Sequence, residues 1–482
     1  MSNSKRHTKK LLYIATVLSL SSLALPNYAA TYTYEGTDTN YIENNPHVLT
    51  DVWRAASTGL YTVDGGTGLI FNFHFDLKGP YNDNHLTVTN LQGIGDVIYT
   101  TLSHDYNAQD DVDSGANNSS LTINLGNKDG TVQQITGGID KNSGSSYGFA
   151  NVAVAAVQVG QATSNTLTIT DSNIEHTAQS KQLIIHTASV DSAYSDDGTP
   201  NISNNQLIIE NSTLKSKNNY GYKNIQLGAA YFYTQGSGEQ RAQLENNEIK
   251  ITNSEIDVHS IQTVSTSGAY NYTPTSSSNT LAIVNSTINT GALYSDVDGY
   301  LKISGARIVT STGIEDSSSN SLTISEGTKI THDLGYGVAS TEGKHRELTI
   351  ATVLGGEHIF ENTLTIDGLT LEVINNSSAD TPSTYVSGEI GGVINGVDTE
   401  VVIAVAAANT VNGWTPDPDI HSNRLTITNS TINEASSTAV YGGMISRASE
   451  VGDEETSAKI YKNTVDISDT TFGDVNVFGA AL

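Results

Sequence analysis

The sequence contains no cysteine and few basic residues. The first feature excludes a disulfide-stabilised fold, and the second argues against a nucleic-acid-binding protein. Without cysteine, disulfide bonds contribute nothing to the stability of the fold. Only 23 Lys and Arg residues stand against 51 Asp and Glu residues, which gives a formal net charge of −28. Binding to a phosphate backbone needs a basic stripe, and the sequence shows none, so nucleic acid is not an expected partner. The dispersed acidic residues are typical of a soluble, self-repelling surface.

Proline is also scarce, with 8 residues in 482, whereas glycine is plentiful with 43. Thr, Ser and Asn dominate the polar positions, and few residues favour long helices. This composition fits many short strands joined by tight polar turns. A chain of this length contains several domains or one long repeat.

The one extended apolar stretch lies near the N-terminus and predicts export. A basic region at residues 5–10 precedes the apolar residues 11–25, and small residues follow as far as Ala30. About 15 apolar residues are short of the ~20 that a membrane-spanning helix needs. Residues 1–30 are therefore interpreted as a signal peptide that is cleaved near Ala30, rather than as a membrane anchor. No later segment is apolar and long enough to span as a helix, so the mature chain is expected to lack a transmembrane helix.

A motif of the form Asn-x-apolar-x-apolar recurs along the chain and defines an internal repeat. Copies begin at Asn84, Asn165, Asn205, Asn247, Asn279, Asn320, Asn362, Asn423 and Asn463. Diverged copies without the first Asn begin at Ser120, Tyr300 and Glu347. A second strand-like element lies between copies, such as KQLIIHTASV from Lys181, and a variable loop rich in Gly, Ser, Asn and Asp follows it. The unit is therefore a strand, a variable loop, an NxLxI strand, an Asn-Ser corner and a short strand.

The apolar alternation of each copy breaks phase at a fixed place. In NRLTITNSTI, residues 423–432, Ile432 follows Ile427 at an odd offset, which places it on the other face of a continuous strand. The residues at and equivalent to the corner position favour the left-handed backbone conformation: Asn429, Asp171, Asn211, Asn253, Asn285 and Gly368. A propeller or sandwich would need antiparallel hairpins with two-residue turns, which these copies lack. The sequence therefore predicts an all-β fold, a single-stranded parallel β-helix (β-solenoid).

Each short unit cannot bury its own apolar face, so it must stack on its neighbours. A coil of ~20 residues and a strand spacing of ~4.8 Å predict about 20 coils and a rod on the order of 90 Å long. Leu and Ile are expected to stack in rows inside, with Thr, Ser and Asn outside or at corners. Residues 31–80 depart from the repeat and include Trp53, so they are interpreted as an N-terminal cap with the first coils. Residues 81–482 are interpreted as the β-helix repeat domain.

The signal-like N-terminus, the lack of Cys, the acidic Gly/Ser/Thr/Asn-rich body and the irregular NTLTITNSTI-type coils together resemble the passenger domains of bacterial autotransporters. The adhesin-like passengers, of the pertactin and AIDA type, are the closest match. The resemblance implies a right-handed parallel β-helix that is displayed on the cell surface, associated with the outer membrane or released. It also implies a role in adhesion, autoaggregation or biofilm formation, and hence in virulence.

The sequence departs from that family at its C-terminal end. Autotransporters end in a membrane β-barrel of amphipathic strands, whereas NTVDISDTTFGDVNVFGAAL still has the pattern of a β-helix coil. Two explanations stay open: the sequence is a fragment or a split gene product, or the export route differs.

Acidic clusters raise the alternative of a secreted polysaccharide lyase or glycoside hydrolase, because enzymes on this fold use acidic residues in a groove. The clusters contain Asp110, Asp111, Asp113, Asp191, Asp196, Asp197, Asp296, Asp298, Asp417 and Asp419. All are expected in Gly/Ser-rich loops, where Asp commonly forms turns, with weak Ca²⁺ binding as the second interpretation. No Ca²⁺-loop spacing, G-x-S-x-G elbow or H-E-x-x-H motif occurs. The sequence therefore assigns no catalytic, cofactor-binding or metal-binding residue, no cofactor is expected, and the protein is interpreted as not an enzyme.

Tyrosines gather in the middle third of the chain and offer a contact surface. They are Tyr220, Tyr222, Tyr231, Tyr233, Tyr270, Tyr272 and Tyr294. On one side of a rod they could stack on sugar rings or pack against another rod, and cross-strand packing of partly buried rings is the competing interpretation. The expected partner is a receptor on a host or bacterial cell, with a glycan as one candidate, and rods could also self-associate.

Overall fold

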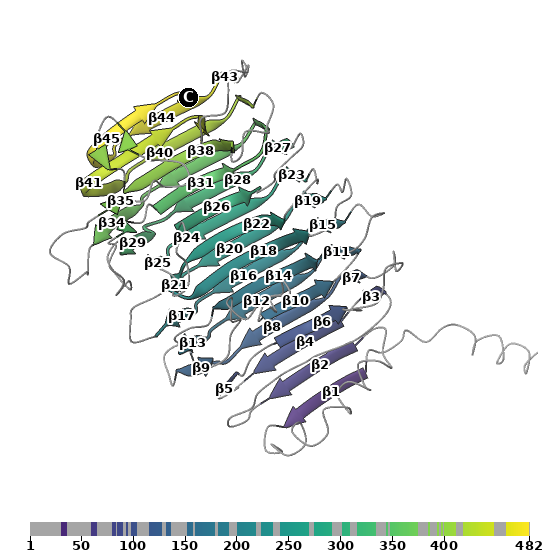
Figure 1. The fold of residues 1–482 in the computed structure, drawn as a ribbon. Coiled ribbons are helices and arrows are strands. Elements are labelled where there is room, and N and C mark those ends of the chain that lie inside the picture. The colour runs from purple at the N-terminus through teal and green to yellow at the C-terminus, as the bar shows by residue number, and fades with distance from the viewer. Residues whose placement is uncertain are drawn as a thin grey trace, which may run out of the picture.

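Parallel strands stacked in three long sheets build the chain (Figure 1). In this computed structural model, the described residues are 30–35, 59–64, 80–82, 84–89, 93–94, 98–103, 115–127, 132–135, 152–157, 160–178, 182–191, 200–217, 223–234, 242–268, 274–291, 301–308, 316–333, 344–345, 348–374, 384–385, 393–394, 397–398, 400–410, 418–447 and 459–481. These residues form strands, bends and turns, with no α-helix among them. The fold is a parallel β-helix, which confirms the predicted fold class. A right-handed coil is the form expected for parallel crossovers.

Each full coil passes through four walls, which we name D, A, B and C in chain order. Wall A is the 12-stranded sheet of β1 (Ala30–Glu35), β2 (Gly59–Asp64), β4 (Asn84–Thr89), β8 (Ser120–Asn124), β12 (Thr166–Thr170), β16 (Gln206–Glu210), β20 (Glu248–Thr252), β24 (Thr280–Val284), β28 (Ser321–Ser325), β33 (Thr363–Asp367), β40 (Arg424–Thr428) and β44 (Thr464–Ser468). Wall D is the 10-stranded sheet of β3 (Pro80–Asn82), β7 (Gly115–Asn117), β11 (Gln161–Thr163), β15 (Asn201–Ser203), β19 (Gln243–Glu245), β23 (Thr275–Ser277), β27 (Asp316–Ser318), β32 (His358–Phe360), β39 (Asp419–His421) and β43 (Lys459–Tyr461).

Walls B and C share the 19-stranded sheet. Wall B contains β5 (Gly93–Ile94), β9 (Gln133–Ile135), β13 (Asn173–His176), β17 (Thr213–Ser216), β21 (Glu255–Val258), β25 (Thr287–Thr290), β29 (Lys329–Asp333) and β34 (Thr370–Ile374). Wall C contains β6 (Ile98–Ser103), β10 (Val152–Val157), β14 (Leu183–Asp191), β18 (Ile225–Thr234), β22 (Ser260–Gly268), β26 (Leu301–Arg307), β31 (Leu348–Leu354), β38 (Val401–Thr410) and β42 (Met444–Arg447). The long strands β41 (Thr431–Tyr441) and β45 (Thr471–Phe478) start on wall B and end on wall C. Two further pairs are β30 (Lys344–His345) with β35 (Thr384–Tyr385) and β36 (Val393–Ile394) with β37 (Val397–Asp398).

The coil length corrects the predicted rod dimensions. Equivalent Asn residues on successive coils are 32 to 61 residues apart, and most are 40 to 42 apart, so the prediction of ~20 residues was wrong. Leu301 and Leu348, which were aligned with the NxLxI copies, lie instead on wall C. The chain therefore contains two series of similar strands, one on wall A and one on wall C, which alternate along the sequence. With 12 strands on wall A and ~4.8 Å between neighbours, the rod is about 50 Å long.

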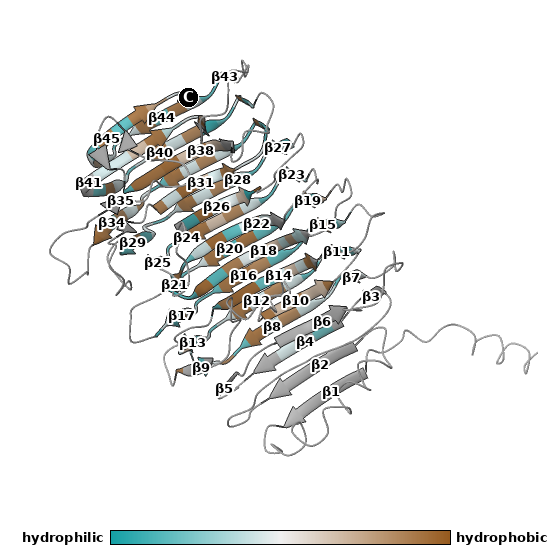
Figure 2. Cartoon of the chain, viewed as in Figure 1, coloured by the Kyte–Doolittle hydropathy of each residue, from teal (hydrophilic) through white to brown (hydrophobic). Residues whose placement is uncertain are grey.

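The interior consists of stacked Leu and Ile rows, as expected from the alternating pattern. On wall A, one row contains Leu121, Leu167, Leu207, Ile249, Leu281, Leu322, Leu364 and Leu425, each 0 % exposed. A second row, two residues further along each strand, runs from Ile123 to Ile427 and is equally buried. Figure 2 shows these rows as hydrophobic bands that cross successive strands. Parallel in-register stacking therefore gives every coil a share of one continuous core.

The corner between walls A and B has the predicted left-handed backbone. The six predicted positions all have positive φ: Asp171, Asn211, Asn253, Asn285, Asn429 and Gly368, with values from 46° to 73°. The residue after the corner is commonly Ser; Ser212 Oγ donates to the Glu210 carbonyl at 2.8 Å and accepts from the Ser172 amide at 3.2 Å. The phase break in the sequence is therefore the turn from one wall to the next.

A second left-handed corner, between walls D and A, precedes the Asn that opens the NxLxI copies, or Ser119 in the diverged copy. Its positive-φ residues are Asn118, Ser164, Asn204, Asn246, Ser278, Ser319, Glu361, Ser422 and Lys462. Because the residue at this corner is Asn, Ser, Glu or Lys in different coils, the sequence alone does not mark the corner. The Asn that follows is buried and binds the next coil: Asn205 Nδ2 donates to Asn247 Oδ1 at 3.0 Å and to the Ala162 carbonyl at 2.8 Å. Repetition of this pattern from Asn165 to Asn463 makes an Asn ladder through the rod.

The predicted N-terminal segments are described only in part. The signal peptide, residues 1–30, lies outside the described residues except for Ala30, where β1 begins. Within residues 31–80, β1 and β2 extend wall A by parallel pairing, β2 onto β4. Trp53 and the rest of the predicted cap lie outside the described residues. None of the described segments forms a helix with the length and hydropathy of a membrane span.

Candidate binding face

The outer side of wall A is a regular array of mostly hydroxyl-bearing side chains. Alternate residues of each strand point outward, and the burial pattern of β12 shows this for Thr166, Thr168 and Thr170. In the middle outward row the residues from β8 to β44 are Thr122, Thr168, Ile208, Lys250, Ala282, Thr323, Thr365, Thr426 and Asp466. Neighbouring coils place these groups ~4.8 Å apart along the rod and ~7 Å apart along a strand. In this row the hydroxyl groups follow one another on β8 and β12 and again from Thr323 to Thr426, so the wall can present several of them to one extended partner.

The corner between walls A and B adds amide and carboxylate groups beside this array. Asn285 Nδ2 donates to Asn253 Oδ1 at 2.7 Å, which joins two coils at the surface. Asn429 Nδ2 and Thr428 Oγ1 donate to Asp367 Oδ1 at 2.9 and 2.8 Å. These hydrogen bonds hold the pKa of the Asp367 carboxyl below its usual value, so it stays an acceptor.

Wall D has an aromatic ladder on its outer side, made of Phe360, His421 and Tyr461. The ring centroids of Phe360 and His421 are 5.4 Å apart, and those of His421 and Tyr461 are 4.9 Å apart, with both pairs stacked. Tyr461 is 41 % exposed, and Lys462 Nζ lies 5.7 Å from its ring centroid. Because neighbouring rings stack face to face, this aromatic ladder presents ring edges along its length, and Tyr461 is its exposed end.

Sequence inspection missed this aromatic ladder, although a signal was present. Phe360, His421 and Tyr461 each lie two residues before a ladder Asn, in HIFEN, DIHSN and KIYKN. The same position is Thr163, Ser203, Glu245, Ser277 or Ser318 in earlier coils. The strands of wall D have three residues each, too short for alternation to reveal them.

Charged residues form a column beside the aromatic ladder. In register on wall D, Asp316, His358, Asp419 and Lys459 follow one another on successive coils. His358 Nδ1 lies 3.1 Å from Asp316 Oδ1, and Asp419 Oδ1 is shielded from solvent without a hydrogen-bond partner. The sequence predicts loops at Asp419 and Asp191, but these residues lie in strands β39 and β14. Those two predictions were wrong because each strand extends into the polar segment.

The remaining acidic candidates and most of the tyrosine candidates lie outside the described residues. The former are Asp110, Asp111, Asp113, Asp196, Asp197, Asp296, Asp298 and Asp417, and the latter are Tyr220, Tyr222, Tyr270, Tyr272 and Tyr294. Tyr231 and Tyr233 lie in β18 on wall C. Tyr231 contacts His186 of the preceding coil with 5.3 Å between ring centroids, so here cross-strand packing of rings is observed.

The His186 imidazole is expected to make stability depend on pH. Burial lowers the pKa of His186 to about 4, and Gly228 gives the ring its space because a Cβ there would lie 2.6 Å from its Cδ2. The unfolded chain, with a pKa of 6.5, then binds the extra proton between the two values. The free energy of unfolding should therefore fall as the pH drops from 6.5 towards 4. Urea denaturation across this range checks it, and a His186→Gln variant should remove that part of the slope.

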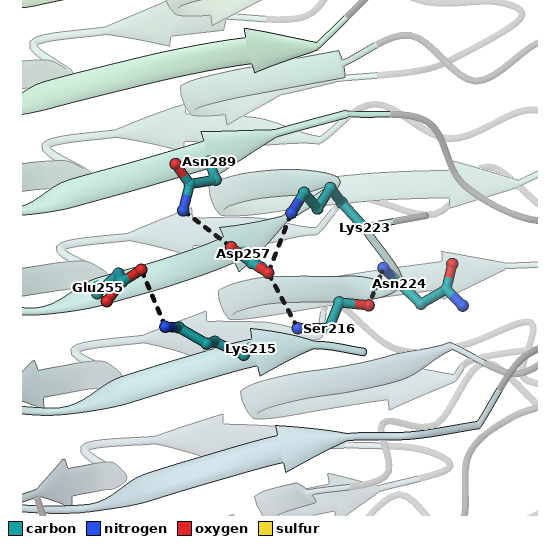
Figure 3. Close-up of polar contacts among 7 residues, drawn as sticks. All are labelled: Lys215, Ser216, Lys223, Asn224, Glu255, Asp257 and Asn289. Carbon is teal, nitrogen blue, oxygen red and sulfur yellow. Dashed lines mark hydrogen bonds and ion pairs between the residues drawn. The ribbon is translucent and has the colours of Figure 1, made fainter. Parts of the chain in front are cut away.

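Wall B carries ion pairs between neighbouring coils, most of them exposed. Lys215 pairs with Glu255 at 3.2 Å and Lys329 with Glu372 at 2.9 Å, with both partners roughly half exposed. Such pairs contribute little to stability. The pair of Lys223 and Asp257 differs, because the Asp257 side chain is only 9 % exposed (Figure 3).

Three findings bear on the enzyme alternative and on ancestry. Within the part of the chain that the structure describes, no three His, Cys, Asp or Glu side chains lie close enough together to hold a metal ion. The ion pairs of Lys215, Lys329, His358 and Arg424 join neighbouring coils on walls B, D and A and do not converge at one place. Neither a family model, nor a curated protein, nor a solved structure matches this chain.

Proposed function

We propose that this protein is an exported bacterial adhesin of the autotransporter passenger type, which acts in cell adhesion, autoaggregation or biofilm formation. The observation that carries the proposal is the regular outer surface of walls A and D. It combines columns of hydroxyl groups with the aromatic ladder of Phe360, His421 and Tyr461. A stiff rod with such columns suits extended contact with another surface.

The proposed mechanism is multivalent contact along the rod. Each Thr hydroxyl or ring edge contributes a weak interaction, and contacts on successive coils add by avidity once the first has formed. The partner is a receptor on a host or bacterial cell, with a glycan as one candidate, or a second rod. The net charge of −28 keeps rods apart until such contacts form. The described walls and the variable loops together would set partner choice.

Display of the chain on otherwise non-adherent cells tests the proposal. Cells that carry it should aggregate or bind host cells more than cells with an empty display scaffold. A triple variant Phe360→Ser, His421→Ser and Tyr461→Ser should reduce that gain, since Ser occupies this row at Ser203, Ser277 and Ser318 without harm to the coil. The matched control is Glu255→Thr on wall B, where Thr213 and Thr287 occupy the same row.

Confirmed surface exposure without any gain in aggregation or binding would contradict the adhesin function. Equal adhesion by the triple variant and the unmodified chain would contradict the role given to the aromatic ladder. Cleavage of a polysaccharide by the purified chain would instead support the secreted β-helix enzyme, a lyase or glycoside hydrolase. Loss of that cleavage in Asp419→Asn would place its site beside His358.

A further inference from the structure

The Asp257 carboxylate holds an amine and a carboxamide from two other coils. Its Oδ2 accepts from Lys223 Nζ at 3.0 Å and from the Ser216 amide at 3.2 Å, and its Oδ1 accepts from Asn289 Nδ2 at 2.9 Å. Figure 3 shows the nitrogen ends of the Lys223 and Asn289 side chains side by side, each directed at one of the two oxygens of the Asp257 carboxylate. An amine and a carboxamide are the two reactants of an amide exchange.

The surroundings fix the lysine and reduce its contact with water. Lys223 is 20 % exposed, and Asp257 is 9 % exposed. A Cβ on Gly291 would lie 3.1 Å from Lys223 Cγ, so the lysine stem passes directly over the residue two positions after Asn289. Asn224, next to Lys223, donates its amide to Ser216 Oγ at 3.0 Å, which ties the lysine backbone to wall B. The lysine side chain therefore lies against the coil that carries Asn289, with its amine on Asp257.

We propose that Lys223 and Asn289 become joined by an intramolecular amide bond, with Asp257 carrying the proton. The Lys223 ammonium transfers a proton to Asp257, and the neutral Nζ attacks Cγ of Asn289. Asp257 then passes the proton to Nδ2, the bond between Cγ and Nδ2 breaks, and ammonia leaves with that nitrogen. The proton left on Nζ goes to the departing ammonia, so the products are one amide and one ammonium ion, and no oxidant or cofactor takes part.

The bond would join the first and the third of three consecutive coils in a chain that has no cysteine. Lys223 lies just before β18, and Asp257 lies on β21. Asn289 lies on β25, in register with Asp257. These elements follow one another along walls B and C, so the bond bridges the middle coil. It would give an exported rod the covalent cross-link that disulfides cannot supply here. The proposal stands apart from the adhesin function, because it concerns how the rod is held together.

Glu175 supplies a comparison within the same wall. Its Oε1 accepts from Lys217 Nζ at 3.2 Å and from Gln134 Nε2 at 3.5 Å, so a carboxylate again lies between an amine and a carboxamide. Lys217, however, is 70 % exposed, so its ammonium is open to solvent. The longer carboxamide contact and the solvated amine both disfavour reaction. This trio should stay unlinked.

Peptide mass spectrometry of the purified full chain tests the bond. After denaturation and trypsin digestion, residues 218–241 should be found joined to residues 251–302, with the combined mass lower by one ammonia and without cleavage at Lys223. The variants Lys223→Arg and Asp257→Asn should instead give residues 218–223, 224–241 and 251–302 as separate peptides. Lys223→Arg keeps the positive charge beside Asp257, so loss of the link there does not stem from unfolding. The control Lys217→Arg should keep the linked peptide.

Each other result counts against the proposal in a defined way. Recovery of only separate, unmodified peptides from the unaltered chain would overturn it. A link that forms equally in Asp257→Asn would overturn the role of Asp257 as proton carrier. A link between Lys217 and Gln134 of similar yield would overturn the argument from burial and distance.

Discussion

Replacing Asn320 with alanine should lower the free energy of unfolding by about 4 kcal/mol, because several buried polar groups lose their partners at once. Asn320 Oδ1 accepts from the backbone amide and from Nδ2 of Asn279, both at 3.0 Å. Asn320 Nδ2 donates to Asn362 Oδ1 at 3.0 Å and to the Ser276 carbonyl at 3.3 Å. All of these groups are buried, so water does not replace what the alanine removes.

Urea denaturation of the full chain measures this loss, and Thr323→Ala is the matched control. Thr323 lies on the same strand, β28, but on its outer row, so its truncation should change stability by no more than about 0.5 kcal/mol. Similar losses for the two variants would show that the Asn ladder contributes no more than a surface threonine does.

The Asn ladder explains how a chain without cysteine keeps its coils in register. Each buried Asn donates to the coil before and to the coil after, so one amide side chain binds three coils. Displacement of any coil by one residue would break these bonds and turn the Leu and Ile rows outward. The polar ladder and the apolar rows therefore specify the same register.

Where apolar alternation is strong and local, the sequence alone predicted the structure correctly. The NxLxI strands and the left-handed corner at Asn211 or Asn429 follow from residue preferences within ten positions. The coil length did not follow, because strands on wall C such as LKISGAR resemble NxLxI strands in isolation. Assigning them to a different wall requires the pairing of residues about 40 apart, which no local pattern contains.

The sequence predicted the hydroxyl-rich rows of the candidate binding face, but not its aromatic ladder. Thr-rich outer rows follow directly from the alternation on wall A. The aromatic ladder did not, since Phe360, His421 and Tyr461 are far apart in sequence and lie on three-residue strands. The Lys223, Asp257 and Asn289 trio was missed for the same reason, as its members come from three coils.

Gly355→Ala should destabilise the protein by more than about 3 kcal/mol, whereas Gly327→Ala should cost about 1 kcal/mol. Both glycines have positive φ, 84° and 76°, so alanine meets the same backbone strain at each. The difference lies in the space around them: a Cβ on Gly355 would overlap the carbonyl group of Ile308, and a Cβ on Gly327 meets nothing within 4 Å.

The close approach at Gly355 is part of the junction between walls C and D. The Ile308 amide donates to the Leu354 carbonyl at 2.7 Å, and the Gly355 amide donates to the Ala407 carbonyl at 2.8 Å, so three coils meet there. A Cβ would push the Ile308 backbone away and break this pairing in β-strands that are buried on both faces, such as β31. Urea denaturation of the two variants measures the difference, and equal losses would show that φ strain alone explains both. A larger loss at Gly355 would mean that the packing of backbone against backbone, rather than the corner conformation, makes glycine necessary at this junction.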